Sequence, residues 1–330
     1  MDLDIVFLGT SASAPTARRA PAALLVRRGG ERLLFDCGEG TQRQLMRSVL
    51  GLPDLEEIFL SHFHADHYLG LPGLLKTFSL RQRELPLTVY GPPGLRELHA
   101  SLKRVIGRLS YPVDLEELRP GDALEREGYR ILAFPVHHGV SSLGYVLAES
   151  PRPGRFDVET ADALGVPPGP ERGALQRGES ITLPDGRVLT PDLVLGAPRA
   201  GRRIVLPGDT APVETVTVLA EGADVLVHEA TFSEEERERA EDTLHSTALQ
   251  AAEIARTAGV RLLALTHISP RHFGRELEEE ATAVFPATVV PRDFDVIEVP
   301  FAERGEPQLL KAGARPPRAA AASDLPVASA

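Results

Sequence analysis

Three histidines and one aspartate lie within the six residues 62–67, in the order His62, His64, Asp66 and His67. The whole chain has only 10 histidines in 330 residues, so this density is far above chance. Neutral imidazole and carboxylate groups are ligands of zinc and similar divalent cations. The cluster directly follows the apolar run 58–60, which predicts a strand that holds it at a sheet edge. The sequence therefore predicts a metal-dependent active site here, in preference to a solvated polar loop.

Other candidate ligands also follow apolar runs. His137 or His138, Asp209 and His267 each come after such a run, where they would project toward one common sheet edge. Seven ligands are too many for one tetrahedral ion and suit two ions about 4 Å apart that share a carboxylate. Asp209 is the natural bridge, because a carboxylate has two oxygen atoms. The candidate ligands are His62, His64, Asp66, His67, one of His137 or His138, Asp209 and His267.

Three residues are candidates for proton transfer at this site. Two adjacent metal ions lower the pKa of a shared water and stabilise the oxygens of a phosphoryl centre. Asp66 could accept the proton of that water. His245 could protonate the leaving oxygen, with Glu229 orienting its imidazole; a helix-capping or surface position is the alternative for His245. His99 and His272 are predicted to be surface residues.

The elements that must position these side chains follow from the apolar pattern. Strands of four to seven residues alternate with helical patterns over 41–50, 69–80 and 234–258, the last as two helices broken near His245 and closed by Gly259. Strands flanked by helices predict an α/β fold with two sheets between helical layers. The predicted strands are 4–8, 23–26, 32–35, 57–60, 87–90, 130–135, 143–147, 203–206, 225–228, 261–266 and 295–299.

Residues 150–202 differ from the rest of the chain. They are rich in Pro and Gly and have few apolar runs, but they contain a β-hairpin pattern with Asp185 and Gly186 at its turn and a short helix pattern closed by Gly165. We interpret this segment as a protruding arm within one catalytic domain, 1–312; a disordered linker is the alternative. Residues 313–330 lack periodicity and are predicted to form a disordered tail.

Composition narrows the class of protein. The net charge of −11 argues against a protein that coats nucleic acid non-specifically. The single Cys37, predicted to be buried, excludes an intrachain disulfide and a cysteine-based zinc site. A signal-peptide pattern and an apolar stretch of membrane-spanning length are both absent, which predicts a cytoplasmic protein without a membrane partner.

The arm is less acidic than the rest of the chain. Residues 151–203 carry eight Arg against seven Asp plus Glu, a balance of +1. This is a modest signal for contact with phosphate groups, weaker than a basic face, and ordinary solvated charge is the alternative. The candidate arginines are Arg199, Arg202 and Arg203, with Arg172 and Arg177.

With these residues described, the chain resembles the metallo-β-lactamase superfamily, whose hallmark is the H-x-H-x-D-H run at 62–67. More narrowly, it is similar to the short-form ribonuclease Z family of tRNA 3′-processing endonucleases. The H-x-H-x-D-H run specifies only the superfamily, whereas the Gly-Pro-containing arm together with the HEAT and HST motifs is specific to the family. The chain lacks an asparagine that the family often has near Ala20, and residues 74–87 also depart from the family pattern, but neither departure touches a ligand. The matching segments are FLGTSASAPT, LLFDCGEGTQRQL, SHFHADHYLGLPGLL, HGVSSLGY, GVPPGPERGALQRG, GDT, HEATF, HSTALQAA and LTHISPRH.

The resemblance implies an αβ/βα four-layer sandwich, the metallo-β-lactamase fold, with two Zn²⁺ ions per subunit; Mn²⁺ would also suit nitrogen and oxygen ligands. It places Asp209 between the ions, makes Asp66 the general base and makes His245 the proton donor. His138 is preferred to His137 because the family's ligand directly precedes a GVSSLGY-like segment. The two implied ligand groups are His62, His64 and His138 for one ion, and Asp66, His67 and His267 for the other.

The implied activity is a zinc-dependent endoribonuclease that cleaves the 3′ trailer from precursor tRNA and leaves a 3′-hydroxyl. The arm would grip the body of the tRNA, usually across a homodimer. The alternative is a small-molecule hydrolase of the same superfamily, such as a glyoxalase-II-like thioesterase or a cyclic-nucleotide phosphodiesterase, which would not need the arm. A non-catalytic RNA-binding module is disfavoured by the complete ligand set.

Overall fold

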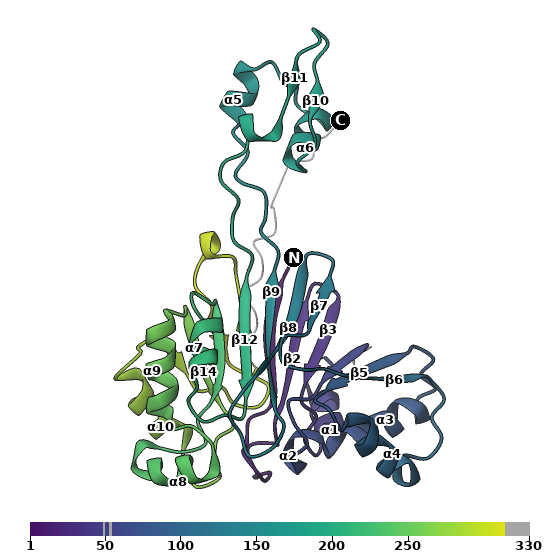
Figure 1. Ribbon diagram of the computed structural model, residues 1–330, viewed down its shortest axis with the longest axis vertical. Coiled ribbons are helices and arrows are strands. Elements are labelled where there is room, and N and C mark those ends of the chain that lie inside the picture. Colours follow the sequence, from purple (N-terminus) through teal and green to yellow (C-terminus); the bar gives the residue numbers. More distant parts are fainter. Residues whose placement is uncertain (49, 53–54, 314–330) are drawn as a thin grey trace, which may run out of the picture.

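Two β-sheets pack face to face, helices cover both outer faces, and an arm extends from one end of this sandwich (Figure 1). The computed structural model describes residues 1–48, 50–52 and 55–313. The tail predicted for 313–330 therefore lies, apart from Gly313, outside the described residues. No helix in the described part of the chain is long and apolar enough to cross a membrane. The predicted α/β sandwich of four layers is confirmed.

The first sheet has eight strands in the order β17-β16-β1-β2-β3-β4-β5-β6. Its pairs are antiparallel from β17 to β3 and parallel from β3 to β6. Its outer face packs on helices through one buried apolar cluster. The strands are β1 Leu3–Gly9, β2 Ala23–Arg28, β3 Glu31–Phe35, β4 Glu57–Phe59, β5 Leu87–Gly91, β6 Val113–Glu117, β16 Val296–Glu298 and β17 Gln308–Leu310, and the helices on this side are α1 Thr41–Arg47, α2 Ala65–Tyr68, α3 Gly70–Leu80 and α4 Leu95–Ile106.

The second sheet has seven strands in the order β15-β14-β13-β12-β9-β8-β7. Strands β12 to β15 run parallel to one another, and β9 is antiparallel to both β12 and β8. A second apolar cluster joins the sheet to its helices. The strands are β7 Ala123–Arg126, β8 Tyr129–Pro135, β9 Leu143–Glu149, β12 Arg203–Gly208, β13 Val225–Glu229, β14 Leu262–Thr266 and β15 Thr288–Val289, and the helices are α7 Glu214–Leu219, α8 Arg237–Thr243, α9 Ala248–Ala258 and α10 Gly274–Thr282, with the 3₁₀ turn η2 Glu234–Glu236. A further 3₁₀ turn, η3 Ala302–Arg304, lies between β16 and β17 of the first sheet.

The core between the sheets holds β4 in place, the strand that leads into the histidine cluster. Phe59 stacks on Phe35 and Tyr90, with ring centroids 4.9 and 4.7 Å apart. From the opposite sheet, the buried hydroxyl of Tyr145 donates a hydrogen bond of 2.8 Å to the carbonyl of Leu60. Contacts from both sheets thus fix the position of β4, and the residues that directly follow it are held in a defined place.

All eleven predicted strands are present, and no boundary differs by more than two residues. The predicted pair of helices over 234–258 is also confirmed, with Leu244 and Gly259 both in the left-handed region at their ends. The helix predicted over 41–50 is shorter, because Ser48 adopts an extended conformation and ends it at Arg47. Strands β6, β7, β15 and β17 were missed, since they are short or carry charged residues at half-exposed positions.

The segment 150–202 leaves the sandwich between β9 and β12 and stands away from it (Figure 1). The hairpin predicted at Asp185 and Gly186 is present, and so is the helix predicted before Gly165. Six buried apolar residues form a small cluster of its own, among them Leu175 and Leu189. The elements of the arm are α5 Val158–Ala163, α6 Pro170–Gln176, β10 Ile181–Thr182, β11 Val188–Leu189 and η1 Pro191–Leu193.

Two predictions about surface side chains are wrong. Arg202 is only 3% exposed and its guanidinium donates to Glu149 and to the carbonyl of Val299, so it is not available to phosphate groups. The side chain of His272 is largely covered and lies 2.6 Å from Glu236 and 3.0 Å from Glu276. Cys37 is buried, as predicted.

Candidate metal centre and active site

The candidate site lies where the carboxyl ends of several strands meet at one edge of the sandwich. Residues 61–67 follow β4, His138 follows β8, Asp209 follows β12 and His267 follows β14. Strands β8, β12 and β14 point in the same direction, because β9 is antiparallel to both β8 and β12. Their carboxyl ends therefore meet at one edge, as the sequence pattern predicts.

All seven predicted ligands come together there. Ligand atoms lie within 4.8 Å of one another in the group His62, His64 and His138, and again in the group Asp66, His67 and His267. Asp209 lies between the two groups: its Oδ2 is 3.2 Å from Nε2 of His67 and 3.9 Å from Nε2 of His62. Among the residues described, His137 and His228 belong to none of the candidate ligand groups.

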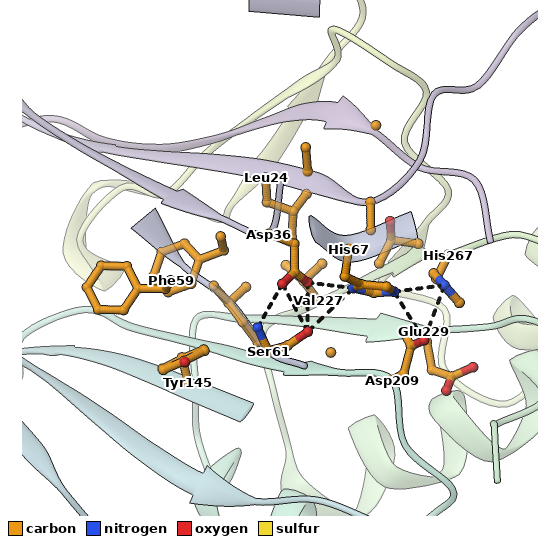
Figure 2. A pocket seen from close by; sticks show the side chains of 17 residues that line it. Leu24, Asp36, Phe59, Ser61, His67, Tyr145, Asp209, Val227, Glu229 and His267 are labelled. Atoms are coloured by element: carbon orange, nitrogen blue, oxygen red, sulfur yellow. Dashed lines mark hydrogen bonds and ion pairs between the residues drawn. The ribbon is translucent and has the colours of Figure 1, made fainter. Parts of the chain in front are cut away.

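Most of the histidine rings are held through their second nitrogen, which orients the first toward the centre of the site. Nδ1 of His67 donates to Asp36 (2.8 Å), and Nδ1 of His267 donates to Thr231 Oγ1 (2.9 Å). Nδ1 of His138 faces the carbonyl of Leu244 at 3.1 Å. Figure 2 shows Asp36 linked to Ser61 and His67 on one side of the His67 ring, with Asp209 and His267 on the other.

Several of these supporting residues have backbone conformations that are costly outside glycine. Ser13, Asp36, Leu244 and His267 all have φ between 55° and 58°. Each serves the site: His267 is a candidate ligand, Asp36 and Leu244 hold ligand rings, and the backbone N–H of Ser13 donates to Asp66 Oδ2 (2.7 Å). The surrounding fold therefore holds the chain in strained positions where it supports the candidate ligands.

The charges of the site fit a bound cation. Burial raises the pKa of the Asp209 carboxyl, but His267 and His67 outweigh burial and hold that pKa well below its usual range. Burial lowers the pKa of His67, whereas Asp209 and Asp36 raise it well above its usual range. Asp209 and Asp36 thus favour a positive charge beside them, and a metal ion held by these ligands would supply that charge.

His62 provides the observation that tests this fit. Its imidazole is fully buried, and burial lowers its pKa well below the usual range. Nδ1 lies 3.0 Å from the Ser61 hydroxyl, but Nε2 has no hydrogen-bond partner. A buried polar nitrogen without a partner is costly. Because this atom faces Asp209 in the middle of the ligand set, a metal ion would satisfy it.

A second constellation, around Glu229, lies beside the ligands. Oε1 of the buried Glu229 is 2.8 Å from Nδ1 of His245, and Oε2 accepts 2.5 Å from the hydroxyl of Thr231, which also holds His267. Burial lowers the pKa of His245, but Glu229 outweighs burial and raises this pKa to about 9. The imidazole is therefore protonated at neutral pH and can donate a proton.

Asp36, Ser61, Thr231 and the carbonyl of Leu244 were not identified from the sequence. Asp36 had the clearest signal, because it follows the predicted strand 32–35 just as the ligands follow theirs. The others act through a hydroxyl or a carbonyl group, which no spacing pattern distinguishes from many similar groups in the chain.

Comparisons with known proteins agree with this geometry. A family profile described as "Metallo-beta-lactamase superfamily" matches residues 17–267. The chain is 47% identical over 303 residues to the ribonuclease Z of Methanosarcina acetivorans, and the aligned region covers 91% of this chain and 99% of that protein. It is 50% identical over 271 residues to the ribonuclease Z of Myxococcus xanthus, and the aligned region covers 82% of this chain and 88% of that protein.

A solved structure of human tRNase Z, short form, superposes with a TM-score of 0.66 at 28% identity and covers 90% of this chain and 99% of that one. The fold, the ligand set and the near full-length similarity to ribonuclease Z sequences lead to one assignment. The chain belongs to the ribonuclease Z family of the metallo-β-lactamase superfamily.

Proposed function

We propose roles for the residues of this site in the endoribonuclease activity of ribonuclease Z, which processes the 3′ end of tRNA. The observation that carries the proposal is the position of Asp209 between two groups of three ligands. In this proposal His62, His64 and His138 hold one ion, and Asp66, His67 and His267 hold the other. We propose zinc, two ions per subunit. When bound, such ions acidify a water and offset the charge of the phosphoryl oxygens.

Asp66 is proposed to hold a metal ion and to accept the proton of the attacking water. Burial raises its pKa, but Nε2 of His267, 3.2 Å away, and the charge of His67 lower it below its usual range. The carboxylate is therefore ionised, as a ligand must be, and it is a weak base that suits only an acidic water. Asp66→Ala should abolish cleavage while precursor-tRNA binding persists, and near-normal turnover would refute the role as proton acceptor.

His245 is proposed to protonate the leaving 3′-oxygen of the tRNA, which becomes its 3′-hydroxyl, while the phosphate stays on the 5′-oxygen of the trailer. It lies beside the ligand set, with its ring centroid 4.9 Å from that of His138 and 5.5 Å from that of His267. Glu229 holds its Nδ1 and supports its protonated form, which leaves Nε2 to act on the substrate. Glu229 is thus a positioning residue, and backbone N–H groups of Thr210, Ser246 and Thr231 donate to its carboxylate and hold it in place.

The arm is proposed to hold the body of the tRNA at a distance from the site of cleavage. Three apolar side chains on it remain exposed, Val158, Val188 and Leu193, and Arg155 is exposed and forms no ion pair among the described residues. Such a surface is suited to contact with a folded RNA. We also propose that the chain acts in the cytoplasm and forms a homodimer. Analytical ultracentrifugation of the purified protein tests the homodimer.

A small-molecule hydrolase was the alternative from the sequence. The superfamily profile alone would fit it, but the relatives matched over nearly their whole length are ribonucleases Z. No feature of the described residues favours the alternative specifically. We therefore retain precursor tRNA as the substrate.

The experiment that tests the proposal is cleavage of a precursor tRNA by the purified protein, with mapping of both product ends. A single cut that leaves a 3′-hydroxyl on the tRNA and a 5′-phosphate on the trailer supports it. Absence of cleavage by metal-loaded protein, or a product with a 3′-phosphate, contradicts it. Activity should be lost on chelation and return when Zn²⁺ is added, with elemental analysis giving the number of ions per chain.

A further inference from the structure

The base of the arm is held by a segment from the opposite sheet. The arm rises from β9 and β12 of the second sheet, whereas residues 299–307 connect β16 and β17 of the first. Phe301 and Glu303 in this connection reach Arg152 and Arg199, one on each strand of the arm's base. We call Phe301, Glu303, Arg152 and Arg199 the clamp.

Glu303 joins the two strands of the base through one carboxylate. Both of its oxygens accept from the guanidinium of Arg152, at 2.9 and 3.1 Å, and Oε1 also accepts from Arg199 at 3.0 Å. These contacts lower the pKa of Glu303 to about 2, chiefly through the hydrogen bond from Arg152. A planar two-point contact restrains direction as well as distance. The two arginines also exchange backbone hydrogen bonds of 2.8 and 2.9 Å, so they form one unit.

Phe301 completes the clamp. The guanidinium carbon of Arg152 lies 3.4 Å from the centroid of its ring, and that of Arg202 lies 4.1 Å away. Arg202 is itself fixed to the sandwich, since it donates to Glu149 and to the backbone of Val299 and Met1. The aromatic ring therefore connects Arg152 at the base of the arm to Arg202, the last residue before β12, which is buried against the sandwich.

The rest of the arm has no comparable support. Within the part of the chain that the structure describes, no hydrogen bond or ion pair joins residues 155–198 to the sandwich. Figure 1 shows the arm standing free above its two connecting strands. These strands are close together: a side chain at Gly154 would meet the carbonyl of Gly196 at 1.9 Å. The orientation of the whole arm therefore depends on its base, where the clamp lies.

We propose that the clamp sets the direction of the arm and so determines the preference of this enzyme for precursor tRNA over small phosphodiesters. The clamp residues are positioning residues, because none of them belongs to the metal site. The inference rests on the proposed function of the arm. When the arm has bound the body of a tRNA, a rigid connection holds the 3′ end of the same tRNA near the active site at a high effective concentration. An arm of variable direction lowers this effective concentration.

The test compares two substrates, a precursor tRNA and bis(p-nitrophenyl) phosphate, which is too small to reach the arm. Glu303→Arg places a third positive charge beside Arg152 and Arg199, and Phe301→Ala removes the ring. Each variant should lower kcat/KM for precursor tRNA about tenfold, mainly through KM, and leave hydrolysis of the small diester within about twofold of wild type. Glu303→Asp should restore most of the loss.

Glu306→Gln is the matched control. Glu306 lies in the same connection and pairs with Arg261 at 3.0 Å, away from the arm, so this variant should cleave both substrates normally. Thermal unfolding of each variant checks that the sandwich is intact. If Glu303→Arg and Phe301→Ala keep wild-type activity on precursor tRNA, or lose both activities equally, the proposal is wrong.

A variant without residues 155–198 separates this inference from the proposed function. If this deletion leaves precursor-tRNA cleavage unchanged, the arm does not hold tRNA and the proposed function of the arm fails. If the deletion lowers cleavage and the clamp variants do not, only the clamp is refuted. In the deleted chain Glu303→Arg should have no further effect, because the clamp then has nothing to orient.

Discussion

The metal centre and the arm are built in opposite ways. Ligands of the metal centre come from four separate segments between residues 62 and 267, and each follows a strand of the sandwich. The arm is one continuous segment with its own small apolar cluster, and beyond its base its ion pairs join residues of the arm itself, such as Arg177 and Glu179. The candidate ligands thus depend on the whole fold, whereas the proposed contact with the body of the tRNA depends on one protruding segment. Damage to the first should affect every substrate, and damage to the second should affect only tRNA.

The largest effect is expected from Asp209, the carboxylate that we propose both ions share. Asp209→Ala removes the carboxylate between the two sets of histidines and leaves Nε2 of His62 further from any partner. Activity on precursor tRNA and on bis(p-nitrophenyl) phosphate should both fall roughly 1000-fold or more, about 4 kcal/mol of transition-state stabilisation. Elemental analysis should show loss of metal. Retention of activity on either substrate would break the comparison.

Deletion of residues 155–198 should give the next largest effect, on one substrate only. The chain ends that remain are adjacent, because Arg152 and Arg199 exchange backbone hydrogen bonds. Cleavage of precursor tRNA should fall about 100-fold, since the second binding site is lost, while the small diester is hydrolysed normally. Parallel kinetics on the two substrates measure this difference. Equal losses would show that the arm supports the chemistry itself.

His245→Ala should lower cleavage about 100-fold without removing metal, as expected for loss of a general acid. Kinetics on precursor tRNA and elemental analysis of the variant measure the two quantities.

Glu229→Gln tests the electrostatic role of Glu229, because it removes the negative charge and keeps the shape of the side chain. Glu229 raises the pKa of His245 to about 9, and the proton donor is lost as pH rises through that pKa. Removal of the negative charge lowers the pKa, so the alkaline limb of the pH–rate profile should move to lower pH. An unchanged alkaline limb would exclude this pair as the acid.

The smallest effect is expected from the core of the arm. Leu175 is fully buried in the arm cluster, and Leu→Ala in a protein core typically costs about 2–5 kcal/mol. Leu175→Ala should therefore raise hydrogen exchange in the arm and lower precursor-tRNA cleavage a few-fold, while the thermal unfolding of the sandwich is unchanged. The matched control is Leu263→Ala, a buried residue of β14, which should lower the unfolding temperature of the sandwich. A lower unfolding temperature for Leu175→Ala as well would mean that arm and sandwich unfold together.

Much of the site could be predicted, because metal ligands are chemically distinctive and follow strands that alternate clearly with turns. His62, His64, Asp66 and His67 are visible from spacing alone, and topology accounts for Asp209 and His267 at the same edge. The supporting residues could not be predicted in this way. Thr231 and the carbonyl of Leu244 contribute ordinary groups, and only their distances from His267 and His138 give them a role.

The sequence by itself determined the longer apolar strands, the ligand types and the family, because these depend on local periodicity and on the chemistry of a few rare side chains. Tertiary structure decided which arginines are exposed to solvent and which form buried hydrogen bonds that stabilise the fold. Arg202 looks like a phosphate ligand in the sequence, but folding buries it against Glu149. Contact between residues 152, 199 and 303 is also invisible in the sequence, since it depends on how two sheets pack across more than one hundred residues of chain. Long-range packing has no local signature, and for that reason the orientation of the arm emerges only from the folded molecule.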